Sequence, residues 1–278
     1  MARLPSAIAA LPVTVFGSTT AHTHELIAAD TALRMPLPLC RRIGVVHLRG
    51  GAGASSTAAA VANTLARRRS GHVLGVNASA GTSHLLPHAG LPASAVQTDE
   101  PSRLSPRRAA DAMAGLPRTP GGLRAYDLLA GGDRDAPAPS SVWFERITPI
   151  SRFFDAIVTD WGVRAWQLDL GQVAAASHTV CVVARADRHT AEEAASVIPA
   201  LLDHEDRPAV VLALVDVGDG REQVIADIVS DTGAPVVWIP FDAARGSRRA
   251  VGSRALSTRS RIAIRRLTMT LLTSGVGR

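Results

Sequence analysis

The sequence has 278 residues, of which 46% are hydrophobic and 19% charged, which is the composition of a globular protein that buries a substantial core. No apolar run reaches the roughly 18 residues of a membrane-spanning helix. The net charge is +6, and all 30 basic residues are arginines, since the sequence contains no lysine. The two cysteines, Cys40 and Cys181, lie far apart and indicate neither a disulfide framework nor a zinc site, so we expect a reducing cytoplasm.

The N-terminal residues 1–38 have no sustained hydrophobic period, which predicts a variable leader with one short helix near residues 24–33. Four prolines interrupt this leader: Pro5, Pro12, Pro36 and Pro38. Residues 39–278 are expected to form a single domain. Within it, residues 87–121 are rich in Pro, Ser, Arg and Ala and lack a clear period, which predicts an irregular insert with limited helix.

After the leader, apolar segments of strand length alternate with helical patterns. The predicted strands cover residues 43–48, 72–77, 155–160, 179–186, 209–217 and 234–241. The predicted helices cover residues 53–69, 142–153, 191–204, 221–230 and 256–273. The strands are continuous β-branched runs, as in strands buried on both faces of a parallel sheet. We therefore expect a doubly wound α/β domain, with a mostly parallel sheet, helices on both faces and ligands beyond the carboxyl ends of the strands.

A glycine cluster joins the first predicted strand to the first predicted helix. Gly50, Gly51 and Gly53 allow backbone amides to turn towards an anion, and the helix N-terminus adds a partial positive charge. Ser55 or Ser56 is placed to hold magnesium, as is the hydroxyl residue of a phosphate-binding loop. A tight connection between strand and helix also uses glycine, so this segment alone is compatible with a structural turn as well.

The order of several motifs resembles the ParA/MinD family of deviant P-loop ATPases, which belongs to the SIMIBI class. The family loop reads Lys-Gly-Gly-x-Gly-Lys-Thr/Ser, and residues 49–55 read RGGAGAS. The second strand of the family ends in Asp-x-Asp, where this sequence has Asn77 and Ser79. The family's next motif, Asp-x-Gly, is matched by Asp160 and Gly162.

A late motif extends the resemblance, which covers residues 40–275 in all and implies the P-loop NTPase fold. The family's Ile-Pro-Tyr/Phe-Asp is similar to the segment that contains Pro240, Phe241 and Asp242. The segments MPLPLCRRIGVV and TPGGLRAYDLLAGG look most like the actinobacterial branch associated with type VII secretion.

The departures from the family pattern fall on residues that carry its chemistry. The resemblance places Ala54 where a lysine contacts the β- and γ-phosphates, and Arg49 where the signature lysine reaches the partner's nucleotide across a dimer. Asn77 and Ser79 replace the aspartates that support magnesium and position the attacking water. Each loss removes transition-state stabilisation of roughly 3–4 kcal/mol, by analogy with oxyanion donors. The sequence therefore predicts a pseudo-ATPase without catalytic residues, its degenerate positions being Ala54, Asn77 and Ser79.

Nucleotide binding is a separate question. The resemblance assigns nucleotide contacts to the loop and to two later motifs: Arg49, Gly50, Gly51, Gly53, Ser55, Ser56, Gly162 and Pro240. It assigns magnesium to Ser55 and Asp160. Three hypotheses stay open: no nucleotide, weak ATP or ADP binding with magnesium, or a working ATPase. The last needs a partner subunit or an arginine to supply the missing charge, and Arg41, Arg42 and Arg49 are nearest in sequence.

Other polar residues have structural interpretations beside functional ones. His47 precedes the loop and is expected to be buried in the strand rather than catalytic. Asp160 either belongs to an inherited magnesium site or caps the turn after its strand. Trp161 is expected to pack over the pocket and discourage nucleotide entry. The nine histidines show no spacing typical of metal ligands.

The C-terminal residues 243–278 are rich in arginine and contain no Asp or Glu. Three interpretations of this region stay open. Its helix docks an apolar face on the domain and leaves the arginines solvated, or the arginines contact DNA phosphates, or the helix attaches to an anionic membrane surface, as the C-terminal amphipathic helix of MinD does.

The resulting hypothesis is a cytoplasmic pseudo-ATPase, or one peripheral at the inner face of the membrane, that acts as a scaffold or regulator. It is expected to form a homodimer, or a heterodimer with an active paralogue, and to bind a protein partner, with type VII secretion as a candidate pathway. One alternative is a partitioning or positioning ATPase that works as a nucleotide-sandwich dimer. Another is a basic DNA-binding accessory protein.

Overall fold

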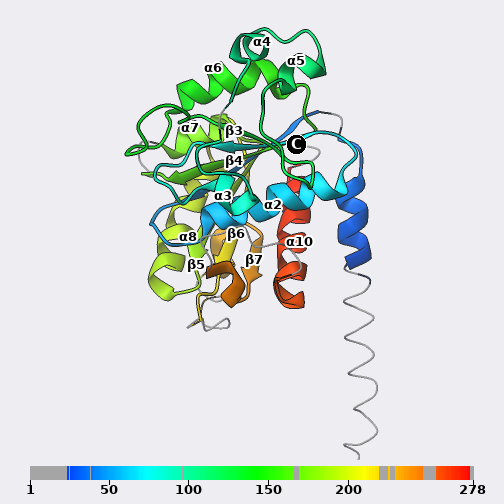
Figure 1. The fold of residues 1–278 in the computed structure, drawn as a ribbon. Coiled ribbons are helices and arrows are strands. Elements are labelled where there is room, and N and C mark those ends of the chain that lie inside the picture. The colour runs from blue at the N-terminus through cyan, green and yellow to red at the C-terminus, as the bar shows by residue number, and fades with distance from the viewer. Residues whose placement is uncertain are drawn as a thin grey trace, which may run out of the picture.

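The computed structural model describes residues 24, 26–37, 39–95, 97–165, 169–218, 225, 229–246 and 255–275 (Figure 1). Its strands are β1 (Arg41–His47), β2 (Val73–Asn77), β3 (Arg124–Asp127), β4 (Ala156–Val163), β5 (Thr179–Arg185), β6 (Ala209–Val215) and β7 (Val236–Ile239). All pair in parallel, in the order β3-β2-β4-β1-β5-β6-β7. The predicted α/β class with a parallel sheet is confirmed.

Helices follow most of the strands. They are α2 (Ala54–Arg68), α3 (Leu85–Ala89), α4 (Glu100–Leu104), α5 (Ala109–Met113), α6 (Ser140–Ser151), α7 (Leu170–Ala175), α8 (Arg188–Leu202) and α10 (Thr258–Thr273). Two 3₁₀ turns, η1 (Ser230–Thr232) and η2 (Ala243–Gly246), flank β7, and residues 26–34 are helical. The predicted helix at 221–230 lies largely outside the described residues.

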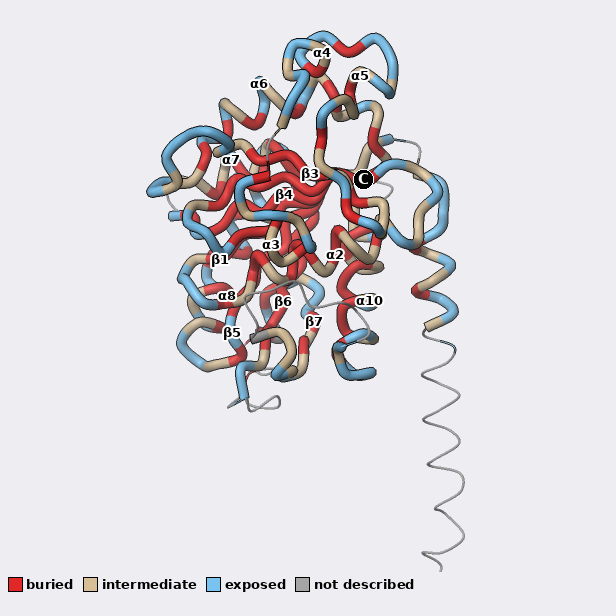
Figure 2. The backbone as a smooth tube through the Cα atoms, in the orientation of Figure 1, coloured by how far each residue is buried: buried red, intermediate tan, exposed pale blue. Residues whose placement is uncertain are grey.

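The sheet has a hydrophobic core on each face, which explains the unbroken apolar strands (Figure 2). One core joins α2, α3 and α10 to side chains such as Val45 and Val158. The other joins α6, α7 and α8 to side chains such as Ile157 and Trp161. Every residue of β6 is buried, as expected for a strand covered on both faces.

The central strands bring the predicted motifs to one edge of the sheet. β1 lies between β4 and β5, and β4 lies between β1 and β2. Val45 pairs with Asp160, but Val46 pairs with Gly162, so the register skips one residue of β4. Asn77 also pairs with Asp160. The carboxyl ends of β1, β2 and β4 therefore meet beside the glycine-rich loop.

The predicted insert at 87–121 contains only short helices, α4, α5 and the end of α3. Arg103 holds it together, because its buried guanidinium donates to the carbonyls of Thr98 and Ala114. The same guanidinium lies 5.4 Å from the ring centre of Tyr126. The boundary at residue 38 stays a prediction. In the described part of the chain, no helix has the length and apolarity needed to cross a membrane.

Candidate functional site

The loop between β1 and α2 has the backbone geometry of an anion-binding turn. Gly51 and Gly53 have φ angles of +83° and +78°, which favour glycine. The carbonyl of Gly53 accepts the Thr57 amide at 2.9 Å and the Ser56 hydroxyl at 2.9 Å, so the first turn of α2 is well formed. Ala54 stands at its first position with 2% of its surface exposed. The loop thus retains its amides but contributes no cation at position 54.

Asp160 connects the loop to two neighbouring elements. Its fully buried carboxylate accepts the amides of Leu85 at 3.0 Å and Gly162 at 3.2 Å, and the hydroxyl of Ser55 donates to it. Burial raises the pKa of Asp160, against the Ser55 hydrogen bond and the nearby His47. Hydroxyl and carboxylate oxygens are ligands of the kind that magnesium takes. The oxygens of Ser55 and Asp160 are thus of the kind that bind magnesium, and Asp160 also accepts two backbone amides within the protein.

Asn77 and Ser79 are engaged within the protein. The Asn77 amide donates to Asp127 at 2.8 Å, and its oxygen accepts the Ser79 amide at 3.1 Å. Asp127 is buried and also pairs with Arg134. Both polar ends of Asn77 are thus used in a network at the end of β2, where the family resemblance implied a magnesium-supporting carboxylate.

Arg49 turns away from the start of α2. Its Nε lies 2.5 Å from the carboxylate of Glu193 on α8, and 55% of its side chain is exposed. The hollow bordered by Arg49, Gly50 and α8 measures about 10 Å³, which is roughly the space for one water. His47 is buried, as expected, and its Nδ1 contacts the Arg49 carbonyl.

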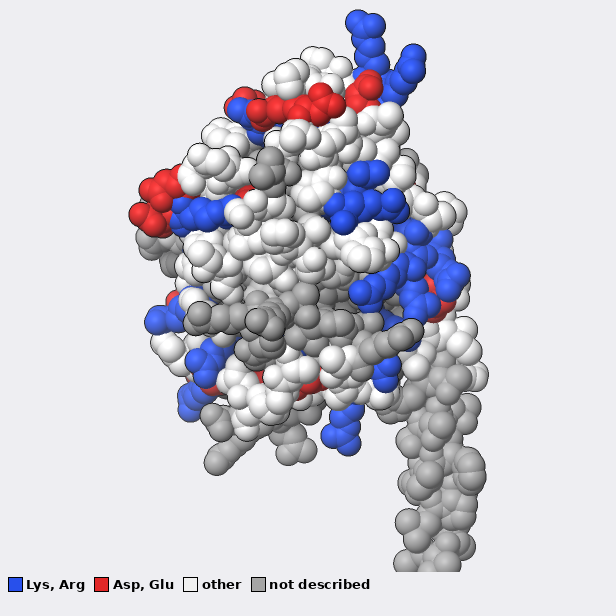
Figure 3. All heavy atoms as spheres, in the orientation of Figure 1, with Lys and Arg blue, Asp and Glu red and all other residues white. Residues whose placement is uncertain are grey.

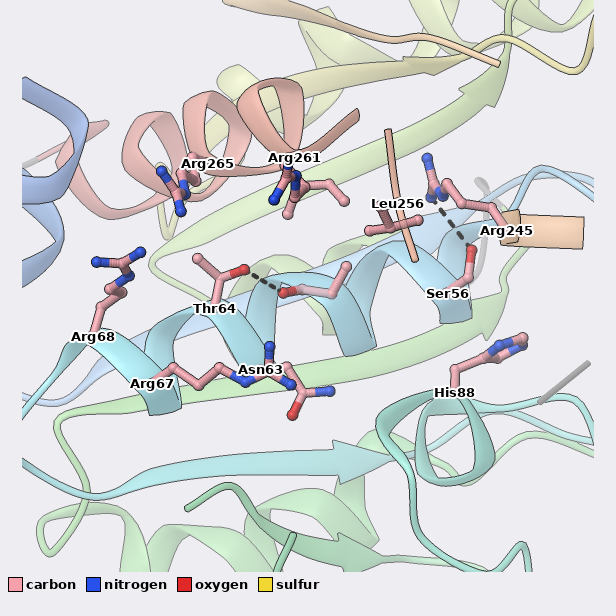
Figure 4. Close-up of a pocket in the computed structure, with 12 residues that line it drawn as sticks. Ser56, Asn63, Thr64, Arg67, Arg68, His88, Arg245, Leu256, Arg261 and Arg265 are labelled. Atoms are coloured by element: carbon pink, nitrogen blue, oxygen red, sulfur yellow. Dashed lines mark hydrogen bonds between the residues drawn. The ribbon is translucent and has the colours of Figure 1, made fainter. Parts of the chain in front are cut away.

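A second arginine, Arg245, reaches the start of α2 from η2. Its Nη2 donates to Thr57 Oγ1 at 2.9 Å. It also donates to Ser56 Oγ at 3.3 Å (Figure 4). Burial lowers its pKa to about 10, so it stays cationic at neutral pH. Asp242, two residues after Pro240, fixes this turn by accepting the amides of Ala244 at 3.1 Å and Ser257 at 2.8 Å. Sequence reasoning did not identify Arg245, although it follows the late motif closely.

No protein-family model matches the chain, and no curated protein sequence matches it. Solved structures do. A ParA family ATPase from Chlorobium tepidum TLS has a TM-score of 0.60 at 19% identity, covering 82% of this chain and 98% of its own. The chain has the ParA/MinD fold. MinD in the Aquifex aeolicus MinC:MinD complex has a TM-score of 0.57 at 18% identity, with 82% of this chain and 95% of that chain covered. Cobyrinic acid a,c-diamide synthase from Mycobacterium smegmatis, with a bound ATP analog and magnesium, has a TM-score of 0.57 at 16% identity. The match covers 84% of this chain and 94% of that chain.

Within this ParA/MinD fold, two of the arginines considered as replacement cations are misplaced. Arg41 donates to Thr179 at 2.7 Å, and Arg42 contacts His178 at 3.1 Å. Both stand at the start of β1, whereas the loop follows its end. Although both are near the loop in sequence, neither is placed to supply charge to it.

Trp161 also lies elsewhere in the ParA/MinD fold than expected. It is fully buried in the α6–α8 core, with its ring centre 6.3 Å from that of Trp143. Successive side chains of a strand point to opposite faces, so Trp161 faces away from α2 when Asp160 faces Ser55. The prediction that it covers the pocket is wrong. Among the described residues, no three His, Cys, Asp or Glu side chains group as metal ligands.

Proposed function

We propose that the chain is a ParA/MinD-like pseudo-ATPase that acts as a scaffold or regulator. The observation that carries the proposal is the start of α2, where Ala54 brings no charge and Arg245 occupies the hydroxyls of Ser56 and Thr57. The ion pair between Arg49 and Glu193 supports it, because it holds the arginine at the signature-lysine position within its own chain. Phosphoryl transfer without positioned cations loses most of its transition-state stabilisation.

Protein partnership follows from the same proposal. The MinD neighbour is described in a complex with MinC, so a protein partner is in keeping with this fold. We propose that the chain forms a homodimer, or a heterodimer with an active paralogue, in the cytoplasm or at the inner face of the membrane. Type VII secretion is the proposed pathway, on the motif resemblance alone.

A second candidate function is nucleotide binding by a partitioning or positioning ATPase. The hydrogen bond between Ser55 and Asp160 favours it, since this pair would hold magnesium while the glycine amides contact the phosphates of ATP or ADP. The structure of cobyrinic acid a,c-diamide synthase with an ATP analog and magnesium gives a precedent in this fold. In this alternative Gly162 and Pro240 complete the nucleotide contacts.

Calorimetry of magnesium-ATP and magnesium-ADP separates the two functions, on the wild type, Ala54→Lys and Ala54→Met. The methionine variant matches the lysine in length but lacks its charge. We expect no binding by the wild type, and binding restored by lysine but not by methionine. No binding by any of the three also fits a scaffold. Tight magnesium-dependent binding with turnover by the wild type would refute the pseudo-ATPase and favour the alternative.

Oligomeric state and DNA retention complete the test. Dimers that form without nucleotide, measured by analytical ultracentrifugation, are expected for the scaffold. ATP-dependent dimers would instead support the ATPase, and ATP-independent retention on DNA would support the basic DNA-binding accessory protein.

A further inference from the structure

A basic cavity lies between α2 and α10, apart from the glycine-rich loop (Figure 4). It measures about 170 Å³, compared with about 10 Å³ for the hollow beside Arg49. Five of its lining residues are arginines: Arg67, Arg68, Arg245, Arg261 and Arg265. None of its twelve described lining residues is Asp or Glu. We call this cavity the basic groove.

The positions of these arginines on their helices are only partly explained by helix stability. Arg67 and Arg68 occupy the last turn of α2, where a cation interacts favourably with the helix dipole. Arg261 and Arg265 stand one turn apart on α10, and like charges at that spacing are unfavourable. Figure 4 shows Arg265 and Arg68 turned into the space between the two helices. Positive charges on α2 and on α10 therefore face each other across the groove.

Neighbouring acids offset this charge only in part. Asp30 pairs with Arg68 at 2.7 Å, but it also pairs with Arg34 at 2.8 Å. Residues 243–278, which include all of α10, contain no Asp or Glu. Burial, together with Arg68 and Arg261, lowers the pKa of Arg265 against the opposing effect of Asp30. The basic groove therefore holds an excess of positive charge.

Arg245 contributes an unused donor at one end of the groove. Its Nη1 is buried and has no hydrogen-bond partner among the described residues. Burial, followed by the charge of Arg245, lowers the pKa of His88, which also lines the groove. A buried charged donor without an acceptor is unfavourable, and an anionic oxygen would satisfy it.

We propose that the basic groove binds a small oligophosphate, a chain of two or more linked phosphate groups, between α2 and α10. Guanidinium groups bind phosphate oxygens in bidentate fashion, and several of them match a linear anion. Arginines also gather on the surface around α2 and α10 in Figure 3, which would attract such an anion. The proposed ligand needs neither Ala54 nor Asp160, although the groove shares Ser56 and Arg245 with the start of α2.

The geometry favours a small ligand over a membrane or DNA. The apolar side of α10 is packed inside the protein, with Ile264, Leu267 and Leu271 buried, so no apolar face of this helix remains for lipid. The described lining contains no Phe, Trp or Tyr on which bases would stack. A recess of this size accommodates phosphate groups but not a duplex.

Calorimetric titration with sodium tripolyphosphate, without magnesium, tests the proposal. The test variant is Arg261→Gln/Arg265→Gln, and the control is Arg259→Gln, which removes an exposed charge from the same helix outside the lining. We expect the wild type and the control to bind alike, and the double variant to bind at least about tenfold more weakly. Added salt should weaken binding by the wild type.

Several outcomes would overturn the proposal. These are no binding by the wild type, equal affinity of the wild type and the double variant, or an equal loss in the control. Duplex DNA and phosphatidylserine vesicles serve as competing ligands, and binding of either without tripolyphosphate binding also overturns it. Arg265→Gln alone should give an intermediate loss, and melting temperatures verify that each variant folds. None of these results depends on whether Ala54→Lys restores ATP binding.

Discussion

Replacement of Gly162 by alanine is expected to destabilise the protein through two separable effects. Gly162 has a φ angle of +70°, where a residue with a Cβ loses about 1–2 kcal/mol. A Cβ at this position would also lie 2.4 Å from the Ser79 hydroxyl oxygen and 2.8 Å from the Ser79 Cβ. Such overpacking costs typically about 1–3 kcal/mol. We therefore expect Gly162→Ala to lower the free energy of unfolding by about 2–5 kcal/mol.

Urea unfolding followed by the fluorescence of the buried Trp143 and Trp161 measures this loss. Gly131→Ala is the matched control, because Gly131 has a φ angle of +74° but no atom within 4 Å of its added Cβ. It should cost only about 1–2 kcal/mol. The double variant Gly162→Ala/Ser79→Gly should recover the overpacking component. Equal losses for Gly162→Ala and Gly131→Ala, or no recovery in the double variant, would refute this account of the close approach.

Three further predictions concern buried groups. Trp143→Phe removes the 3.0 Å hydrogen bond from the indole to Thr159 and should cost about 1–2 kcal/mol in urea unfolding, whereas in a Thr159→Val background the cost should shrink. Burial and, after it, the charges of Arg42 and Arg41 lower the pKa of His178 to about 4, so the folded protein favours the neutral imidazole. The free energy of unfolding should therefore fall by about 1–2 kcal/mol, after solvent screening, as the pH drops from about 6.5 to about 4. The variant His178→Asn should not show this loss. Burial raises the pKa of Cys181 to about 12, so peptide mass spectrometry should find it unmodified by iodoacetamide in the folded protein at neutral pH; labelling as fast as in urea would contradict this.

Local properties of the chain were sufficient to predict the α/β fold class, although the edge strand β3 was not among the predicted strands. A strand buried on both faces needs an unbroken apolar run, and β6 shows this pattern directly. The glycine-rich loop was recognisable because positive φ angles at Gly51 and Gly53 restrict the residue type. Strand geometry also contained information that the sequence interpretation missed. Arg41 and Arg42 are the first two residues of β1, so the length of the strand separates them from the loop, and Trp161 points to the opposite face of the sheet from Asp160.

The contacts that decide the state of the loop could not be predicted from local pattern. Arg245 lies 189 positions after Ser56, and Glu193 lies 144 positions after Arg49. Both contacts require the packing of β7 and α8 to bring distant segments together, and no periodicity in the sequence encodes it. The basic groove could not be predicted for the same reason, because its arginines belong to three segments that are separate in sequence, α2, η2 and α10.

The turn that contains Arg245 makes the loop and the basic groove thermodynamically linked. The same guanidinium donates to Ser56 and Thr57 at the start of α2 and lines the groove. A ligand that accepts hydrogen bonds from Arg245 in one place changes the binding free energy of a ligand in the other. By reciprocity, the change is equal in both directions. Because Asp242 anchors this turn to the start of α10, such competition also acts on the helix that carries Arg261 and Arg265. A ligand in the groove that binds Arg245 would therefore alter the hydrogen bonds of Ser56 and Thr57, even though the loop has no cation at position 54.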